Sequence, residues 1–206
     1  MENKEKQYTS RELQALNTKK KLFQAALQLM KNKGYDNFTV REVCKIAGTS
    51  TGNFYNYFNS KEQILSYYYE MAGNDFEVYL RAHDTDQNPI EKMVSFYVWY
   101  ARYTADFGLD FCRAFFSSNN KSLNTDKIYN RIMEITFAFV QEAANEGFLY
   151  LDGRTCEEIT KDMCVVVKGA IMDWCVYDGG YDLPQYVQRL LTNCIKGILY
   201  PVKLDV

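Results

Sequence analysis

Residues 49–65 (TSTGNFYNYFNSKEQIL) bring short hydroxyl and amide side chains together with closely spaced aromatic ones. If the first half of this segment is a helix, Phe54 and Phe58 lie one turn apart and can pack against the protein. Thr51 and Asn53 are then free to face outward. Short hydroxyl and amide groups can hydrogen-bond base edges and phosphates in the major groove of DNA. The polar side of this segment is therefore predicted to be a DNA surface, with the aromatic side as its anchor.

Other side chains of the same segment suit close contact with DNA. Gly52 removes a side chain where another surface would approach, although glycine costs a helix roughly 1 kcal/mol. Tyr55 and Tyr57 can offer hydroxyl groups to phosphates. Lys61 stands at the N-terminus of a following helix, and helix N-termini themselves bind phosphate.

The elements that must position these residues are helical. Apolar residues recur with helical spacing nearly throughout, β-type alternation is hard to find, and only three prolines interrupt the chain. The sequence predicts an all-α fold, with helices over residues 18–33, 39–47, 50–57, 61–82, 89–105, 110–117, 126–146, 155–177 and 183–199.

Two of these helices are short and adjacent. Thr39 and Glu42 form a T-x-x-E capping box, and an amphipathic apolar face follows them. Gly48 breaks this helix, and Ser50 can cap the next one. Two short helices joined by a tight turn that contains glycine are typical of a helix-turn-helix.

Residues 18–65, about a quarter of the chain, resemble the DNA-binding domain of the TetR family of bacterial transcriptional regulators. The departures are mild, with Cys44 in place of the usual alanine and Thr49 in place of the usual valine. The matching positions, at fixed spacing, are Ala26, Gly34, Tyr35, Phe38, Thr39, Val40, Ala47, Gly48, Gly52, Phe54, Tyr55, Tyr57, Phe58, Lys61, Glu62 and Leu65.

The resemblance implies three regions. A flexible arm at residues 1–17 would precede a three-helix helix-turn-helix domain at residues 18–65, and a larger helical domain at residues 66–206 would bind a ligand and dimerise. The implied DNA contacts are made to bases or adjacent phosphates by Arg41, Thr51, Gly52 and Asn53, to the backbone by Tyr55, Tyr57 and Lys61, and from cap regions by Thr39 and Ser50.

A helix-turn-helix protein of this kind is expected to be a homodimer. One such motif reads only a few base pairs, so affinity comes from two of them about 34–36 Å apart on a palindromic operator. In the family the last two helices form a four-helix interface, which implies residues 155–177 and 183–199 here. Their apolar stripes could serve both a core and a partner, and they comprise Ile159, Met163, Val166, Val167, Ala170, Trp174, Val187, Leu190, Leu191, Cys194, Ile195 and Ile198.

Between the DNA reader and these helices lies a block dense in aromatic residues. The density exceeds what packing three helices needs, and buried tyrosine hydroxyls require partners. A mostly apolar cavity with a few polar groups is typical of a small-molecule site. The predicted effector is apolar or aromatic, flat or elongated, with Arg102 and Arg113 as partners if it is anionic. The candidate ligand-binding residues are Phe96, Tyr100, Tyr103, Phe111, Phe115, Tyr129, Met133, Phe137, Met163 and Trp174.

The mechanism that the resemblance implies is a population shift. A ligand would favour a state in which the helix at residues 61–82 has swung, so that the two recognition helices no longer match consecutive major grooves. DNA would then be released. Repression relieved by a ligand is commoner in the family than activation.

Charge and composition limit the kinds of partner and the location that the protein can have. Residues 1–72 carry four more basic than acidic residues, and residues 73–206 six more acidic than basic, which suggests two different partners. No apolar run approaches a membrane span, and the first residues lack the apolar core of a signal peptide, so we expect a cytoplasmic protein.

Three other function classes compete with a ligand-responsive regulator. An enzyme is disfavoured, because the only histidine, His83, falls in an expected loop and no glycine-rich phosphate loop is present. Six widely spaced cysteines without a CxxC pair fit buried thiols, so no metal or cofactor is expected. A regulator controlled by a protein partner, or by oxidation of cysteines such as Cys164 and Cys175 on one helical stripe, stays open.

Overall fold

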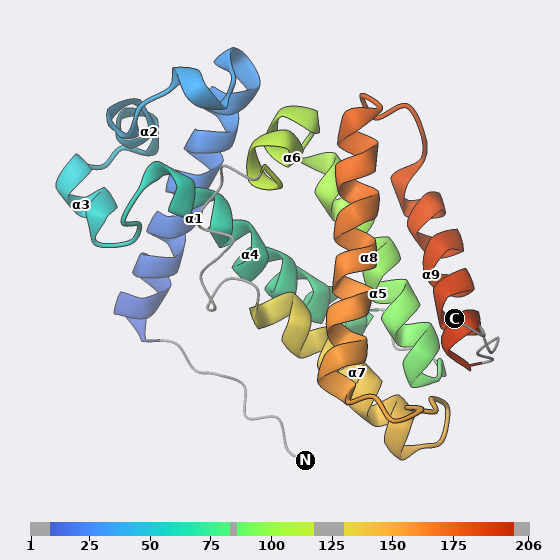
Figure 1. Ribbon diagram of the computed structural model, residues 1–206. Helices are drawn as coiled ribbons and strands as arrows, with labels where there is room; N and C mark the ends of the chain where they lie inside the picture. The colour runs from blue at the N-terminus through green and yellow to red at the C-terminus, as the bar shows by residue number, and fades with distance from the viewer. Residues whose placement is uncertain (1–8, 83–85, 118–129, 200–206) are drawn as a thin grey trace. The chain divides into compact units, whose positions relative to one another are not determined.

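The computed structural model describes residues 9–82, 86–117 and 130–199, which Figure 1 draws as coloured ribbon. Within these ranges the chain contains helices and no strands, which confirms the expected all-α class. The chain divides into two compact units, Met1–Tyr67 and Tyr68–Val206. The boundary falls inside the continuous helix α4 (Lys61–Ala82), two residues beyond the boundary expected from the sequence.

The first helix, α1 (Ser10–Lys33), starts eight residues earlier than expected. Thr9 and Glu12 form a capping box, in which the Glu12 carboxylate accepts from the Thr9 amide at 2.8 Å. Thr18, where the helix was expected to begin, lies inside it, and its hydroxyl donates to the Gln14 carbonyl. Residues 10–17 are therefore helical and not part of a flexible arm. Residues 1–8 of the expected arm lie outside the described residues.

The helix-turn-helix consists of α2 (Val40–Ala47) and α3 (Thr51–Tyr55). A 3₁₀ turn, η1 (Tyr35–Asn37), precedes it. Gly48 takes the left-handed conformation that ends α2, with φ of 67°. Helix α3 ends two residues earlier than expected. The amides of Asn56 and Tyr57 bond three residues back, to Asn53 and Phe54, and tighten the last turn.

The expected capping box of α2 is present and predicts an acid-sensitive contact. The Glu42 carboxylate binds the Thr39 amide and pairs with Lys33 on α1. The Lys33 ammonium, followed by the Thr39 hydrogen bonds, lowers the pKa of Glu42 to about 2. A carboxylate whose folded pKa is depressed stabilises the fold above its unfolded pKa of 4.5, and this stabilisation is lost as the pH falls through 2.

Glu42→Gln should therefore flatten the pH dependence of stability between pH 4.5 and 2, because the amide cannot ionise. The measurement is the urea midpoint of the full chain as a function of pH, for wild type and variant. Asp36→Asn, which alters an exposed carboxylate nearby, is the matched control and should follow wild type. Equal acid sensitivity of wild type and Glu42→Gln would contradict the assignment.

The C-terminal unit contains the rest of α4 and five further described helices. They are α5 (Pro89–Asp106), α6 (Leu109–Phe115), α7 (Asn130–Asn145), α8 (Cys156–Val176) and α9 (Leu183–Leu199). Helix α5 packs against α7 and α9, and α8 packs against α6, α7 and α9 (Figure 1). Residues 126–129, expected to open the seventh helix, lie outside the described residues.

Helix starts in this unit follow the sequence signals. Asn88 and Glu91 form a capping box with Pro89 in the first turn of α5. Thr155 and Glu158 form the expected box at α8. These local signals define where α5 and α8 begin, and the two helices supply most of the cavity lining described below.

Candidate nucleic-acid interface and ligand cavity

The helix-turn-helix separates an apolar anchor from a polar outer surface. Phe54 and Phe58 are buried, and their ring centroids lie 5.5 Å apart. Thr51 and Gly52 are exposed at the start of α3, and Tyr55 is 56% exposed. The phenyl ring of Phe54 meets the ring of Tyr55 edge-on, so the anchor also orients an exposed phenol.

Two other candidate DNA residues of α3 are engaged within the helix. The Ser50 hydroxyl accepts from the Asn53 amide at 3.1 Å and caps the helix. The Asn53 side chain donates to the Thr49 hydroxyl at 2.8 Å, and its carbonyl oxygen accepts from Asn56. Asn53 is half-buried, so base contact by its amide would require these bonds to open.

The remaining candidate DNA residues differ in how far they reach solvent. Arg41 is exposed near the start of α2, and Tyr57 is half-buried. Thr39 is exposed, but its hydroxyl serves the capping box. The Lys61 ammonium lies 4.3 Å from the ring centroids of both Tyr35 and Phe38, and burial lowers its pKa. Lys61 is thus held against rings of its own unit.

A polar groove lies between α1 and α3 beside this surface. It has a volume of about 600 Å³. Its walls are Arg11, Gln14, Ala15 and Thr18 on α1, and Asn53, Asn56 and Tyr57 at α3. The α1 residues were not among the predicted DNA contacts, because the sequence analysis placed them in the flexible arm or at the start of the helix. The Thr9-x-x-Glu12 capping pattern could have revealed them.

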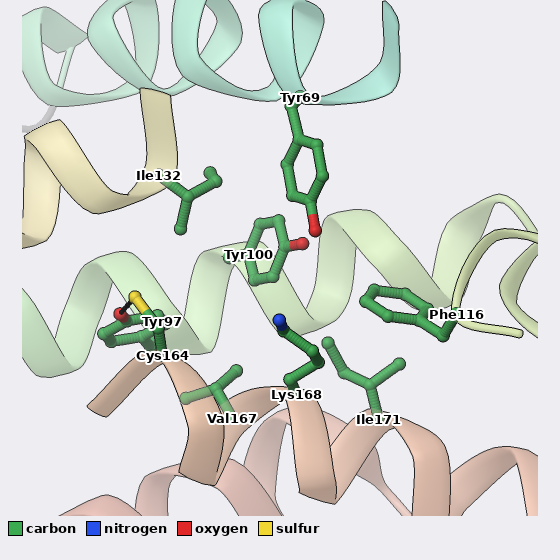
Figure 2. A pocket seen from close by; sticks show the side chains of 9 residues that line it. All are labelled: Tyr69, Tyr97, Tyr100, Phe116, Ile132, Cys164, Val167, Lys168 and Ile171. Carbon is green, nitrogen blue, oxygen red and sulfur yellow. Dashed lines mark hydrogen bonds between the residues drawn. The ribbon is translucent and has the colours of Figure 1, made fainter. Parts of the chain in front are cut away.

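A second cavity lies within the C-terminal unit (Figure 2). It holds about 20 Å³, room for roughly one water molecule. The nine lining side chains come from α4, α5, the end of α6, α7 and α8, and are Tyr69, Tyr97, Tyr100, Phe116, Ile132, Cys164, Val167, Lys168 and Ile171.

One end of this cavity is closed by an internal hydrogen-bond network. The Tyr97 hydroxyl lies 2.7 Å from the Thr136 hydroxyl and 3.0 Å from the Cys164 thiol. Thr136 also donates to the Ile132 carbonyl on its own helix. These buried polar groups are therefore paired with one another, as burial requires.

The other polar groups lie toward the opposite side of the cavity. In Figure 2 the hydroxyl groups of Tyr69 and Tyr100 lie close together, and the Lys168 nitrogen points toward them. Burial raises the pKa of Tyr100 well above its ordinary value. Burial also lowers the pKa of Lys168. The structure thus brings one amine and two phenols to the same part of an apolar cavity.

Of the ten residues expected to bind ligand, only Tyr100 lines this cavity. Tyr129 lies outside the described residues. The Tyr103 hydroxyl donates to Asp75 at 2.9 Å. Met133 and Phe137 are half-buried elsewhere on α7, and five of the ten are buried away from the cavity, namely Phe96, Phe111, Phe115, Met163 and Trp174.

The cationic residue at the cavity is Lys168, which sequence reasoning missed. Arg113 pairs with Asp178 and donates to the Cys175 carbonyl, while Arg102 is exposed. The available signal was a lone lysine within the apolar run CVVVKGAIM at residues 164–172. Such a lysine costs burial free energy and therefore marks a candidate site.

The expected dimer stripes pack largely inside the unit. Ile159, Met163 and Val167 are buried, as are Val187 and Leu191, whereas Ile198 lies outside the described side chains. The apolar side chains that α8 exposes are different ones. Val165, Met172 and Val176 are 55%, 47% and 77% exposed, at spacings of seven and four residues along one side of the helix.

Two classes of site are absent from the part of the chain that the structure describes. No group of three or more His, Cys, Asp or Glu residues could hold a metal ion there. No described helix is long and apolar enough to cross a membrane.

Comparison with known proteins supports the helix-turn-helix assignment. Residues 22–68 match the sequence model of the bacterial regulatory proteins of the tetR family. An uncharacterised helix-turn-helix-type transcriptional regulator, YvdT of Bacillus subtilis (strain 168), is 40% identical over 45 residues. That match covers 22% of this chain and 23% of YvdT, so the chain spans less than a quarter of this relative.

Solved structures share the fold over most of the chain. The TetR-family repressor FadR of Thermus thermophilus, in complex with lauroyl-CoA, has a TM-score of 0.69 at 22% identity, covering 91% of this chain and 98% of FadR. FadR of Bacillus subtilis, in complex with stearoyl-CoA, has a TM-score of 0.69 at 19% identity, covering 87% and 98%. At these identities the similarity establishes the fold.

Proposed function

Because residues 22–68 belong to the tetR family of bacterial regulatory proteins, we propose that this chain is a dimeric, ligand-responsive transcriptional repressor acting on DNA in the cytoplasm. The observation that carries the proposal is the two-sided α3 helix. Thr51, Gly52 and Tyr55 face solvent, while Phe54 and Phe58 fix the helix from behind. A recognition helix needs this arrangement to hold its polar side in a major groove.

The DNA contacts divide by chemistry. Thr51 can reach base edges, and Gly52 allows close approach at the helix start. Tyr55, Tyr57 and Arg41 can bind phosphates, together with Thr39, Ser50 and Asn53 near the helix starts. Arg11 in the α1–α3 groove adds a cation beside α3, whereas Lys61 would have to leave the rings of Tyr35 and Phe38 to contribute.

The proposed dimer uses α8 and α9. The exposed side chains of Val165, Met172 and Val176 form an apolar strip along α8, which water solvates poorly. A two-fold dimer would bury this strip against its own copy and set two recognition helices one turn of DNA apart. The operator would then be palindromic.

The proposed effector is a small apolar or aromatic molecule bound in the cavity of the C-terminal unit. The two FadR relatives, bound to lauroyl-CoA and stearoyl-CoA, support a ligand with an apolar body. Because the cavity holds roughly one water molecule, a ligand can enter only a more open state. Its preference for that state would shift the population away from the DNA-binding conformation, through the continuous helix α4.

The test is selection of genomic DNA fragments by the purified full chain at two salt concentrations. Enrichment of a palindromic site, with binding of one dimer per site, is the expected result. Phosphate contacts release counterions, so affinity should fall steeply as the salt concentration rises. Failure to enrich any sequence, even at low salt, would overturn the proposal.

A second candidate regulation is oxidation of a thiol pair, which one observation favours. The side chains of Cys112 on α6 and Cys175 on α8 hydrogen-bond to one another, and this bond lowers the pKa of Cys175. Cys164, which the sequence analysis placed on one helical stripe with Cys175, hydrogen-bonds to Tyr97. Thiolates react faster than thiols, so Cys175 is the reactive partner.

Hydrogen peroxide would oxidise this pair to a disulfide, with two protons leaving the thiols and two water molecules formed per peroxide. Operator affinity should then change after peroxide treatment and recover with dithiothreitol. Cys175→Ser should be insensitive to peroxide, and Cys44→Ser, altering a buried thiol of the other unit, is the matched control. Unchanged operator affinity after peroxide treatment would exclude this regulation.

A further inference from the structure

The polar groove between α1 and α3 lies along one flank of the recognition helix. Asn56 keeps right-handed helical backbone angles, so the helical turn continues to Tyr57. Two residues of helix correspond to a rotation of roughly 200°, which places Tyr55 and Tyr57 on nearly opposite sides of α3. Tyr57 lines the groove and Tyr55 does not. The groove and the exposed Tyr55 ring therefore flank α3 on its two sides.

This placement matches the geometry of a helix in the major groove of DNA. The major groove is about 12 Å wide, and a helix with its side chains measures about 10–12 Å across, so the helix fills it. The phosphates of the two strands then border the helix on its two sides. With Tyr55 beside one strand, the α1–α3 groove faces the other.

The walls of this groove suit an anion. Among the described residues that line it, Arg11 is the one cation and none is acidic. The neighbouring Glu12 does not line the groove, and its carboxylate accepts from the Thr9 amide and hydroxyl, both at 2.8 Å. Arg11 is exposed and, within the part of the chain that the structure describes, has no ion pair or hydrogen bond. A guanidinium carries five N–H donors in a fork that matches a phosphate group.

Two further side chains can donate to the same anion. Gln14 follows Arg11 by three residues on α1, and Tyr57 stands on the α3 wall of the groove. Neither the Gln14 amide nor the Tyr57 hydroxyl has a hydrogen bond within the described ranges. The Asn53 amide, in contrast, already donates to Thr49. A guanidinium, an amide and a phenol from two elements thus border one space of about 600 Å³.

We propose that the α1–α3 groove binds a backbone phosphate of the operator, on the strand opposite to the one that Tyr55 contacts. Arg11, Gln14 and Tyr57 donate hydrogen bonds to the phosphate oxygens. The first turns of α1 are then part of the DNA-binding surface, and each subunit holds both strands. This assignment rests on the proposed function, which it deepens by naming the DNA group that the groove takes. Contacts to phosphate fix the position of α3 on the duplex without reading its sequence.

Removal of the Arg11 charge tests the contact. Arg11→Gln should raise the dissociation constant of the selected operator about 10- to 100-fold, and that of unrelated DNA by a similar factor, because phosphates carry no sequence information. One phosphate per subunit is two per dimer, so the slope of log affinity against log salt should become about 1.8 less steep. Arg102→Gln removes an exposed arginine of the other unit and is the matched control.

A second variant tests the sign of the charge that the groove accepts. Gln14→Glu is isosteric and places a carboxylate in the groove, so operator affinity should fall at least ten-fold. Glutamate is as good a helix former as glutamine, so α1 should keep its stability. Gln24→Glu makes the same change on the same helix and should bind as wild type does. Gln24 is exposed, does not line the groove and lies about 15 Å further along α1, beyond the screening length of about 8–10 Å.

Operators with single neutral methylphosphonates identify the phosphate itself. One position in each half-site should weaken binding of wild type and leave Arg11→Gln unaffected, because that variant has already lost the contact. The position to which Tyr55→Ala is indifferent should lie on the other strand. The proposal is overturned by unchanged affinity and salt slope in Arg11→Gln, by the absence of such a position, or by both positions falling on one strand.

Selection of an operator by wild type separates this failure from failure of the proposed function. A chain that selects an operator, and whose binding ignores changes at Arg11 and Gln14, retains its regulator role and loses only the α1 contact. A wild-type chain that selects no operator loses both.

Discussion

Thr51→Ala combined with Tyr55→Ala should weaken binding to the selected operator by about 100- to 1,000-fold. Each change removes a polar group from the exposed side of α3, and a dimer presents each change twice. Four lost hydrogen bonds at about 1 kcal/mol each give roughly 4 kcal/mol, or close to a thousand-fold in affinity. The measurement is the dissociation constant for the operator at fixed salt.

The single variants should separate loss of sequence discrimination from loss of general affinity for DNA. Thr51→Ala should reduce discrimination between the operator and unrelated DNA, whereas Tyr55→Ala should weaken binding to both. Tyr150→Ala removes a tyrosine that is 70% exposed in the other unit, so it is the matched control and should bind as wild type does. Wild-type affinity in the double variant, with an unchanged circular dichroism spectrum, would exclude α3 as the recognition helix.

Local signals account for what the sequence predicted well. The capping boxes at Thr39 and Thr155 and the break at Gly48 involve residues close in sequence. They can therefore be recognised from the sequence alone. The burial of Phe54 and Phe58 also follows from helical spacing. Fold class and the outer side of α3 were predictable for the same reason.

The errors have two different physical origins. The start of α1 was expected at residue 18, eight residues too late, although Thr9 and Glu12 carry the pattern of a capping box. The cavity lining was missed for a deeper reason. Which aromatic residues face a cavity, and which fill the core, depends on how α4, α5, α7 and α8 pack against one another, and helical spacing within one segment cannot determine this.

Tyr68 shows that residues of the aromatic block pack against one another in the core. It was not among the ligand candidates, yet it is completely buried in the C-terminal unit. Its ring lies within 5.2 Å, between centroids, of the rings of Phe107, Phe111 and Phe115. Its hydroxyl hydrogen-bonds with that of Thr104, which also donates to the Tyr100 carbonyl. Phe111 and Phe115, which were expected to bind the ligand, thus pack against Tyr68.

Tyr68→Ala should lower the free energy of unfolding by about 3–5 kcal/mol, the usual cost of replacing a buried aromatic side chain with alanine. Tyr68→Phe keeps the ring contacts and removes the hydrogen bonds of the hydroxyl to Thr104 and Tyr100, so it should cost less, about 1–2 kcal/mol. Thr104 stays paired in that variant through its bond to Tyr100. The measurement is urea unfolding of the full chain, followed by circular dichroism and tyrosine fluorescence.

The ratio between these two losses is the informative quantity. A large loss in Tyr68→Ala with a small one in Tyr68→Phe assigns the stability to ring packing around Phe111 and Phe115. Similar losses in both variants would instead place it in the Thr104 hydrogen bond and contradict the packing argument. Tyr68 is the first residue of the C-terminal unit and lies within α4, so its packing also fixes the helix that, in the proposed mechanism, links the ligand to the DNA-binding unit.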